Sequence, residues 1–211
     1  KERQVGEEEP FFLWVNFPHM HFRTHIPDDQ IGRAGQWQSI YHDAMVGHDE
    51  NVGTVLDAID SLGIADNTLV MYSTDNGPHK NTWPDGATSP FRNEKNSGWE
   101  GAFRVPAFVR WPGVIEPGTV SNQIVSHLDW APTLLKAAGV DDIQGKLQEG
   151  YEANGKEYKV HLDGYDLVPY LSGEVDTSPR NRFFYFSDEG DLLAMRFDNW
   201  KTHFLVQDSP G

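Results

Sequence analysis

The sequence has 211 residues, no cysteine and a formal net charge of −15, because 32 Asp and Glu outnumber 17 Lys and Arg. A surface of this sign disfavours nucleic acid and anionic membranes, so an anionic substrate would need a local positive site. The lack of cysteine excludes disulfides, zinc–thiolate sites and a cysteine nucleophile. Hydrophobic residues make up 38% of the sequence, which is enough for one substantial core, or for one domain with a small second one.

The first part of the chain predicts a strand, a loop and a long helix. Residues 1–10 are charged and have no apolar period, which indicates a linker or an exposed end. Residues 11–17 form a continuous apolar run that predicts a buried strand of a parallel sheet. Between residues 37 and 62, apolar side chains recur at spacings of three and four, which predicts an amphipathic helix that ends at Gly63. We expect its acidic face, from Asp43 to Asp60, to be solvated.

A second short apolar run, residues 69–72, predicts a strand that leads into Asp75, Asn76 and Gly77. Strand, helix and strand would form a βαβ unit with a right-handed crossover. Ligands of open α/β sheets bind beyond the carboxyl ends of the strands. A carboxylate next to a carboxamide offers two hard oxygen ligands, which suit Ca²⁺ or Mg²⁺. The alternative is that Asp-Asn-Gly forms only a surface turn.

The rest of the chain predicts a long loop and then a second group of elements. Residues 78–98 are polar, and a structureless loop of this length is usually functional or disordered. Because the loop leaves the Asp75 end, we expect it to be functional. The further elements are a strand at 107–111, a helix from Asp129 to about Ala138, an excursion at 140–160, a short helix within 162–171, and strands at 183–186, 192–197 and 201–206. Consecutive strands without helices between them predict a small antiparallel sheet.

Two motifs in a fixed order resemble a known family. They are Ser73-Thr-Asp-Asn-Gly-Pro78 and, after Lys95, Trp99-Glu-Gly-Ala-Phe-Arg-Val-Pro106. With Asp129-Trp-Ala-Pro-Thr-Leu-Leu135 in the matching place, they resemble the second half of a type I sulfatase (arylsulfatase-like), and the resemblance spans nearly the whole chain. It implies an α/β fold like that of alkaline phosphatase, in which a mixed sheet, here partial, is flanked by helices and followed by a small C-terminal antiparallel sheet subdomain. The catalytic α/β domain would cover residues 11–140, and the excursion with the small subdomain residues 141–211.

The resemblance also implies roles for individual residues. Asp75 and Asn76 match two ligands of a bound Ca²⁺, or of Mg²⁺ in its place. Lys95 matches a lysine that contacts the sulfate oxygens, and His21 a histidine that contacts the sulfate and protonates the leaving oxygen. His25, Arg23 and His79 are candidates for contacts with the alcohol part of the substrate. The plainer alternative for each of these side chains is a solvated or packed loop residue.

Other conspicuous residues are expected to be structural. Glu100 and Arg104 would attach the lysine loop to the next strand, His127 and Asp129 would begin a helix, and Trp83 and Trp99 would be packed aromatics, with contact to a sugar or aryl group as the alternative.

One motif of the family is absent. Its nucleophile is a formylglycine made from the Cys or Ser of a C/S-x-P-S-R segment, and no such segment occurs. Thr177-Ser-Pro-Arg180 is superficially similar but lies in the wrong part of the sequence. We therefore expect this sequence to be the C-terminal portion of a sulfatase that is inactive alone. The formylglycine and further metal ligands would come from the N-terminal half of the same protein.

The predicted function is hydrolysis of a sulfuric ester at a Ca²⁺ site, with a sulfated small molecule or a sulfated carbohydrate as substrate and without a nucleic acid or membrane partner. One alternative is a phosphonate or phosphate ester hydrolase of the same superfamily. Another is a non-catalytic folded fragment that binds ions weakly. Periplasmic or secreted localisation is expected by family analogy only, since no signal segment is visible.

Overall fold

The computed structural model describes residues 10–205, which group into two compact units. The first unit contains residues 10–112, Tyr185–Leu193 and 204–205, and the second contains Gly113–Phe184 and Ala194–His203. Except for Pro10, the predicted linker at residues 1–10 lies outside the described residues. Between residues 10 and 205, none of the helices has the length and apolar character needed to cross a membrane.

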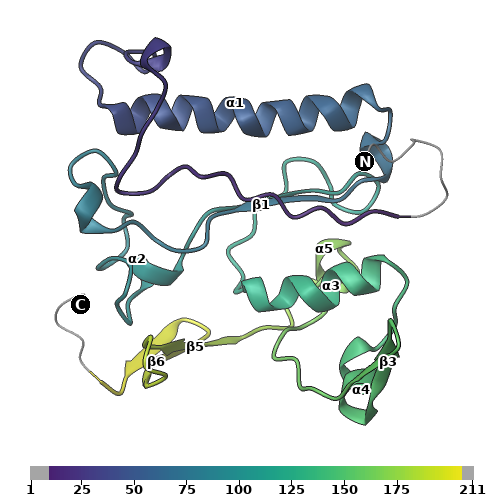
Figure 1. Ribbon diagram of the computed structural model, residues 1–211. Helices are drawn as coiled ribbons and strands as arrows, with labels where there is room; N and C mark the ends of the chain where they lie inside the picture. The colour runs from purple at the N-terminus through teal and green to yellow at the C-terminus, as the bar shows by residue number, and fades with distance from the viewer. Residues whose placement is uncertain (1–9, 206–211) are drawn as a thin grey trace. The chain divides into compact units, whose positions relative to one another are not determined.

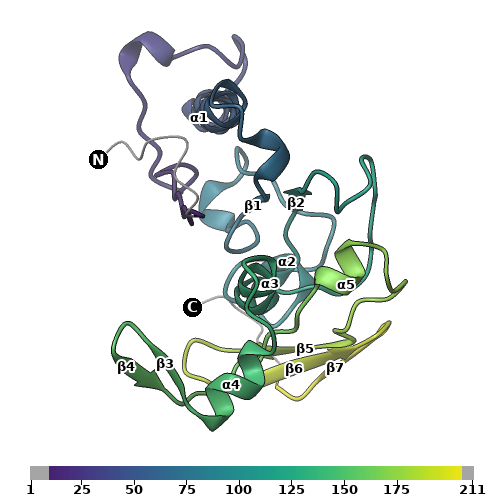
Figure 2. The ribbon, with the colours of Figure 1, turned by 90° about the vertical axis from the view of Figure 1, so that its right-hand side faces the viewer.

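The first unit combines a long helix with a two-stranded sheet (Figure 1). Its elements in chain order are η1 (Asp28–Gln30), α1 (Ile40–Ser61), η2 (Ala65–Asn67), β1 (Val70–Ser73), η3 (Lys80–Thr82), α2 (Glu100–Phe103) and β2 (Ala107–Arg110). Looking down α1 in Figure 2, the strands β1 and β2 lie beside the helix. A hydrogen bond between His48 and Tyr72 (2.9 Å) and an ion pair between Arg110 and Asp60 (3.5 Å) join the helix to the strands.

The ends of α1 follow from local signals in the sequence. Ser39 is the N-cap, and its side chain and that of His42 form a capping box. At the other end, Gly63 has φ +68°, a conformation that glycine adopts without strain. Its N–H donates to the carbonyl of Asp60, and the N–H of Ile64 donates to that of Ile59, so the helix ends in a Schellman motif. The predicted helix and its stop are therefore confirmed.

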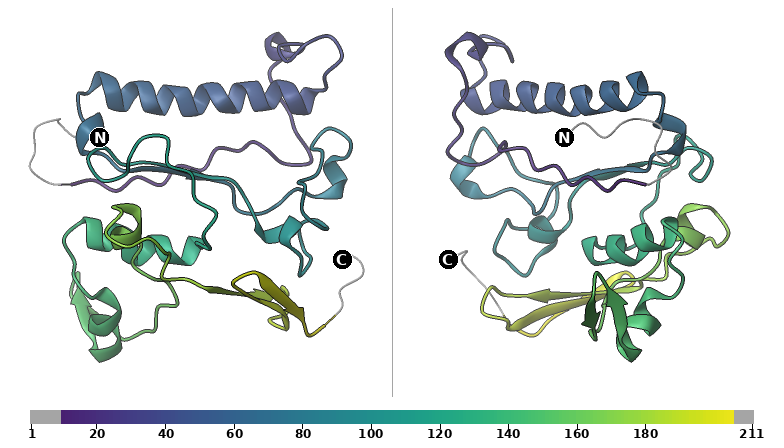
Figure 3. Two further views of the ribbon diagram at one scale, coloured as in Figure 1. Left: turned by 180° about the vertical axis from the view of Figure 1, so that it is seen from behind. Right: turned by 45° about the vertical axis from the view of Figure 1, so that its right-hand side comes forward.

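The predicted parallel βαβ unit is wrong for the described residues, because its expected first strand, at residues 11–17, is not formed and β1 pairs with β2 instead. β1 and β2 are antiparallel, with Val70 opposite Arg110 and Ser73 opposite Ala107. Residues 11–17 form no strand but an extended segment that runs along β1 (Figure 3). The physical reason is the absence of neighbours, because a strand buried on both faces needs cover that residues 10–205 do not supply. Phe12 is 72% exposed and Trp14 77%.

The second unit contains short helices, a hairpin and most of a three-stranded sheet. Its elements are η4 (His127–Asp129), α3 (Trp130–Ala137), α4 (Ile143–Glu149), β3 (Tyr151–Ala153), β4 (Lys156–Tyr158), α5 (Val168–Leu171), β5 (Arg182–Phe186), β6 (Leu192–Phe197) and β7 (Trp200–His203), where parts of β5 and β6 are assigned to the first unit. The strand order is β5-β6-β7, and β6 and β7 are antiparallel, so the predicted small C-terminal sheet is present. The predicted excursion contains α4 and the β3–β4 hairpin, neither of which we expected.

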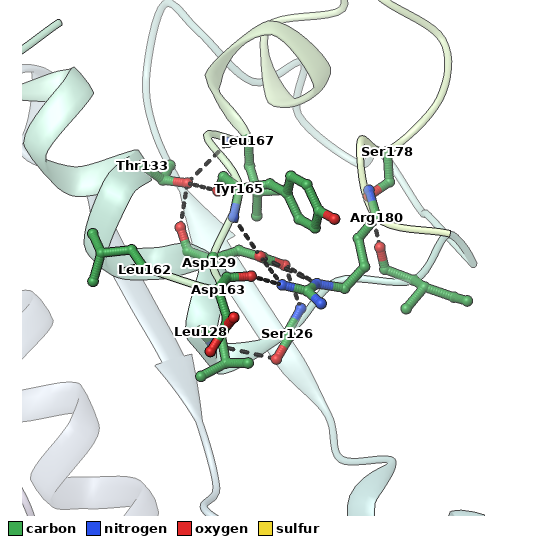
Figure 4. A network of polar contacts seen from close by, with 12 residues as sticks. Ser126, Leu128, Asp129, Thr133, Leu162, Asp163, Tyr165, Leu167, Ser178 and Arg180 are labelled. Atoms are coloured by element: carbon green, nitrogen blue, oxygen red, sulfur yellow. Dashed lines mark hydrogen bonds and ion pairs between the residues drawn. The ribbon is translucent and has the colours of Figure 1, made fainter. Parts of the chain in front are cut away.

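A buried polar network joins three segments of the second unit (Figure 4). The carboxylate of Asp129 accepts hydrogen bonds from the backbone N–H groups of Ser126 and Tyr165, both at 2.8 Å, and from the guanidinium of Arg180. Arg180 also donates to the carbonyl of Asp163 at 2.9 Å. Asp129 thus lies in the first turn of the helical segment that η4 and α3 form, where Ser126 and not Asp129 is the N-cap, and its carboxylate also fixes two later segments of the chain.

Candidate active site

The end of β1 is held at two points by hydrogen bonds to another segment of the first unit. The hydroxyl of Ser73 donates to the carbonyl of Pro106 at 2.8 Å, and the N–H of Gly77 donates to the carbonyl of Ala102 at 2.7 Å. Between these two bonds lie Asp75 and Asn76. The predicted metal ligands therefore sit on a short turn whose two ends are fixed to the segment that runs from α2 to β2.

Two glycines of the paired motifs allow this close packing. A Cβ atom on Gly77 would lie 1.8 Å from the carbonyl oxygen of Gly101, and one on Gly101 would lie 1.9 Å from the carbonyl oxygen of Asn93. The N–H of Gly101 donates to the carbonyl of Arg92 at 2.8 Å. Because backbone approaches backbone at both places, neither position tolerates a side chain. The D-N-G and E-G sequences are thus two sides of one contact, which explains why they occur together.

Lys95 is brought close to the same turn. Its N–H donates to the carbonyl of Pro78 at 2.9 Å, so its backbone is bonded to the residue that directly follows the turn of Asp75, Asn76 and Gly77. Asn93, two residues before Lys95, and Asn96, directly after it, have φ of +65° and +66°, in the left-handed region. The side chain is half-buried, and within residues 10–205 its ammonium group forms no ion pair. A cation without a partner in this position can receive an anionic oxygen.

The oxygens of Asp75 and Asn76 fit two ligands of a hard cation. The Oδ1 atom of Asp75 accepts from the N–H of Asn76 at 2.8 Å, and the amide of Asn76 donates to the carbonyl of Gly77 at 2.8 Å. Each bond leaves one side-chain oxygen without a partner in the described part of the chain. Asp75 is exposed and Asn76 half-buried, so both oxygens can be reached. Residues 10–205 contain no group of three or more His, Cys, Asp and Glu that could hold a metal, so these two would be a partial ligand set.

The predicted catalytic histidine lies in an exposed loop. His21 is exposed, and its carbonyl accepts the hydroxyl of Thr24. The guanidinium of Arg23 lies 5.4 Å from the ring centroid of Phe22. His19 donates from Nε2 to the carbonyl of His25 at 3.2 Å, which closes the loop. Within the described residues, His21 makes no side-chain bond to Asp75 or Lys95, so the structure does not join these three candidates by direct contact.

Two hollows of the first unit are lined by the loop that follows Asn76, and the first of them is also lined by the histidine loop. One, of about 280 Å³, is lined by Phe22 and Thr24 from the histidine loop and by Trp83 and Asp85 from the other loop. The second, of about 250 Å³, is lined by His79, Glu94 and again Trp83. The Nδ1 atom of His79 accepts the N–H of Asn81 at 3.1 Å, so this predicted substrate contact also caps a short helix.

The residues expected to be structural do not all make the contacts that we predicted. The guanidinium of Arg104 lies 4.3 Å from the ring centroid of Phe91 and so attaches the lysine loop, as expected. Glu100 instead accepts the hydroxyl of Tyr185. The guanidinium of Arg92 covers Trp99 at 3.6 Å. Trp83 is not a packed aromatic, because it is 64% exposed at the rim of both hollows.

The acidic face of α1 was expected to be solvated from Asp43 to Asp60, but Asp43 is buried and His48, within the same stretch, is half-buried. His48 is half-buried between Phe17 and Tyr72, and burial, with the positive charge of His19 nearby, lowers its pKa. The sequence contained a signal for this, since His48 stands three residues after Met45 and four before Val52 on the apolar face. Asp43 is 2% exposed.

The comparisons with known proteins decide the family. A family model described as Sulfatase matches residues 3–140. The chain belongs to the sulfatase family. An arylsulfatase of Hemicentrotus pulcherrimus is 32% identical over 205 residues, which cover 94% of this chain and 33% of that protein. The sulfatase chain described here spans about a third of the length of the curated relatives that it matches.

Solved structures share the fold. The crystal structure of the sulfatase PsFucS1 from Pseudoalteromonas sp. matches with a TM-score of 0.72 and 30% identity, and covers 88% of this chain and 34% of its own. The structure of Ps i-CgsB in complex with k-i-k-neocarrahexaose also matches with a TM-score of 0.72, at 26% identity, and covers 93% of this chain and 42% of its own. The predicted partial α/β fold is therefore confirmed.

Proposed function

We propose that the protein to which this chain belongs hydrolyses sulfuric esters, and that this chain supplies one side of the site. The observation that carries the proposal is the backbone contact through Gly77 and Gly101, which places the Asp75 turn beside Lys95. An oxygen-rich turn and a lysine whose backbone is bonded to Pro78, directly after that turn, are suited to a sulfate held between a cation and a lysine.

Each residue has a separate task in this proposal. Asp75 and Asn76 would hold Ca²⁺, or Mg²⁺, through one carboxylate and one amide oxygen. The bound cation would supply positive charge to the sulfate oxygens. Lys95 would neutralise charge on the same oxygens as it develops in the transition state. His21 would donate a proton to the leaving oxygen, for which a histidine is suited near neutral pH.

The remaining parts of the site are proposed to come from outside this sequence. The 211 residues contain no C/S-x-P-S-R segment, so a formylglycine nucleophile would be supplied by the N-terminal half of the same protein. Further metal ligands would come from there too, because two protein oxygens are few for Ca²⁺. On this proposal the 211 residues alone release no sulfate, and turnover by them would contradict it. Residues 11–140 would belong to the catalytic domain and residues 141–211 to the small subdomain.

We further propose a sulfated small molecule or a sulfated carbohydrate as substrate. A related structure in complex with a neocarrahexaose supports a carbohydrate, and Arg23, His25 and His79 are candidates for contacts with its alcohol part. Periplasmic or secreted localisation is proposed by family analogy.

The test compares two esters of the same phenol. Full-length protein supplied with Ca²⁺ is expected to hydrolyse 4-nitrophenyl sulfate with a higher kcat/KM than 4-nitrophenyl phosphate. Lys95→Ala should lower the value for the sulfate by about 100-fold or more, because a preorganised charge is lost. Lys156→Ala, an exposed lysine of β4, is the control and should leave it unchanged. A preference for the phosphate would favour the phosphoryl hydrolase, and turnover of neither ester by wild type would favour a fragment without catalysis.

A further inference from the structure

An exposed tryptophan stands at the rim of a small hollow in the first unit. The hollow has a volume of about 280 Å³, near the lower end of the range for small-molecule sites (about 300–1,000 Å³). Trp83 is 64% exposed, and Phe22 on the histidine loop is 44% exposed. Large aromatic side chains bury most of their surface in an ordinary protein interior. Two exposed aromatic rings around one hollow of this size therefore indicate a binding surface for a ring of similar size.

The other lining side chains are polar. Asp85, Asn81 and Tyr41 line the same hollow. Within residues 10–205, neither the carboxylate of Asp85 nor the side-chain amide of Asn81 has a hydrogen-bond partner. Burial raises the pKa of the Tyr41 hydroxyl, which keeps it protonated and able to donate. An aryl group would cover these polar atoms without bonding to them, and that costs free energy. A pyranoside would offer a hydroxyl to each of them.

An aromatic face and a set of polar side chains complement the two kinds of surface on a pyranose ring. The axial C–H groups form an apolar patch with a small positive polarity, which is attracted to the negative face of an indole. The ring hydroxyls point outward and form directional hydrogen bonds. A carboxylate such as that of Asp85 has two oxygens and can accept from two neighbouring hydroxyls.

Residues that line the hollow or the one next to it are chain neighbours of the two residues proposed to contact the sulfate. Phe22 directly follows His21 in the chain, and Trp83 lines the second hollow together with Glu94, the neighbour of Lys95. We propose that Trp83 is the stacking platform for the pyranoside ring of a sulfated carbohydrate, and that Asp85 accepts hydrogen bonds from its hydroxyls. This inference rests on the proposed sulfatase function and names the class of alcohol that the site accepts.

The test compares sulfated sugars with an aryl sulfate in the full-length protein. The probes are the 6-sulfated methyl glycosides of galactose, glucose and N-acetylglucosamine, with 4-nitrophenyl sulfate as the aryl reference. Trp83→Ala should lower kcat/KM for the preferred glycoside by about 10- to 100-fold, mainly through KM, and Trp83→Phe should restore most of it. Asp85→Ala should lower kcat/KM for the glycoside at least about ten times more than for the aryl sulfate.

A matched control is Trp200→Ala, which removes another exposed tryptophan, one that does not line the hollow. The inference is overturned if Trp83→Ala lowers glycoside turnover no more than Trp200→Ala does, or if Asp85→Ala affects both kinds of ester equally. Unfolding midpoints of all variants identify any that have lost their fold. If Trp83→Ala is one of them, the glycoside kcat/KM of Trp83→Phe, which keeps an aromatic ring, tests the inference in its place.

A second measurement separates this inference from the proposed function. Calorimetric titration with the corresponding unsulfated methyl glycosides does not require turnover. Binding by wild type that is weakened about tenfold in Trp83→Ala would support the platform even if no ester is hydrolysed. Failure of wild type to bind any of the three sugars, sulfated or not, would overturn the inference while leaving aryl sulfate hydrolysis intact.

Discussion

Arg180 forms a bidentate ion pair with the carboxylate of Asp129 through two nitrogen atoms, and both side chains are buried. Nε donates to Oδ2 at 2.9 Å and Nη2 to Oδ1 at 2.6 Å, while Asp129 is 0% and Arg180 6% exposed (Figure 4). The residues are 51 positions apart in the chain. Because every carboxylate oxygen also accepts a backbone N–H, this ion pair is fully hydrogen-bonded, the condition under which a buried charge pair is tolerated.

Removing one partner of this pair should destabilise the second unit strongly. Asp129→Asn leaves the guanidinium of Arg180 buried without a counter-charge, and we expect a loss of about 3–5 kcal/mol in the free energy of unfolding. Asp141→Asn is the control, since Asp141 pairs with Lys136 at the surface and should cost less than about 1 kcal/mol. Urea denaturation monitored by circular dichroism measures both. If Asp129→Asn lowered the free energy of unfolding no more than Asp141→Asn does, the buried ion pair would not be needed for the stability of the second unit.

The close backbone contact at Gly77 and Gly101 in the candidate site leads to a prediction for both stability and turnover. Gly77→Ala and Gly101→Ala would each drive a methyl group into a backbone carbonyl, at 1.8 and 1.9 Å. The chain must shift to relieve this, so we expect a loss of about 1–3 kcal/mol of stability together with a large fall in sulfate release. Thermal unfolding and turnover are measured on the same preparations of full-length protein.

Gly53→Ala serves as the matched control for these substitutions. Gly53 lies within α1, and a Cβ atom there would meet nothing within 4 Å. We expect a gain of about 0.5–1 kcal/mol, since alanine is the better helix former, and no change in turnover. If Gly77→Ala behaved like Gly53→Ala, the close approach of the two motifs would not matter for the site.

The periodic elements were predictable because their signals are local. The apolar spacing of α1, its Gly63 stop and the short runs at β1 and β2 come from neighbouring residues, and each was found at its place. The β3–β4 hairpin had a local signal too, which we missed. It turns on Asn154 and Gly155 with φ of +51° and +69°, the Asn-Gly sequence typical of a tight hairpin turn.

Features that depend on distant residues could not be predicted in the same way. The segment 11–17 is apolar enough for a buried strand, yet burial depends on neighbours that the pattern does not specify. At the site, the motifs identified Asp75 and Lys95, but the reason for their pairing is the backbone contact at Gly77, which only coordinates reveal. The exposure of Trp83 is equally a property of loop packing, and no spacing in the sequence encodes it.

The proposed metal ligands can be tested by titration as well as by activity. Asp75→Ala removes one of two protein oxygens, and in the full-length protein we expect Ca²⁺ affinity to fall by at least about 10- to 100-fold. Calorimetry on metal-free protein reports the affinity, and the rate at limiting Ca²⁺ should fall with it. Asp188→Ala, an exposed aspartate in the turn before β6, is the control for lost negative charge. Unchanged Ca²⁺ affinity in Asp75→Ala would refute the assignment.

Asp43 should make the first unit sensitive to acid. Its carboxylate accepts the N–H groups of Gly32 at 2.8 Å and Ala34 at 2.7 Å, and so ties the preceding loop to the first turn of α1. These two bonds, first that of Ala34 and then that of Gly32, lower the pKa of Asp43. A carboxyl whose pKa is lower in the folded than in the unfolded state stabilises the fold above the unfolded value, about 3.9, and loses this contribution as pH falls through the folded value.

The Asp43→Asn variant isolates this contribution. The amide keeps one acceptor oxygen but turns an NH₂ group toward the second N–H, so one bond is lost and the negative charge with it. We expect the variant to be less stable than wild type at pH 6, and the difference to shrink as pH falls below about 4, because wild type then loses its charge as well. Chemical denaturation at several pH values measures the difference, with Asp57→Asn on the exposed side of α1 as control. A difference that stays constant down to acid pH would mean that the charge of Asp43 does not hold the loop.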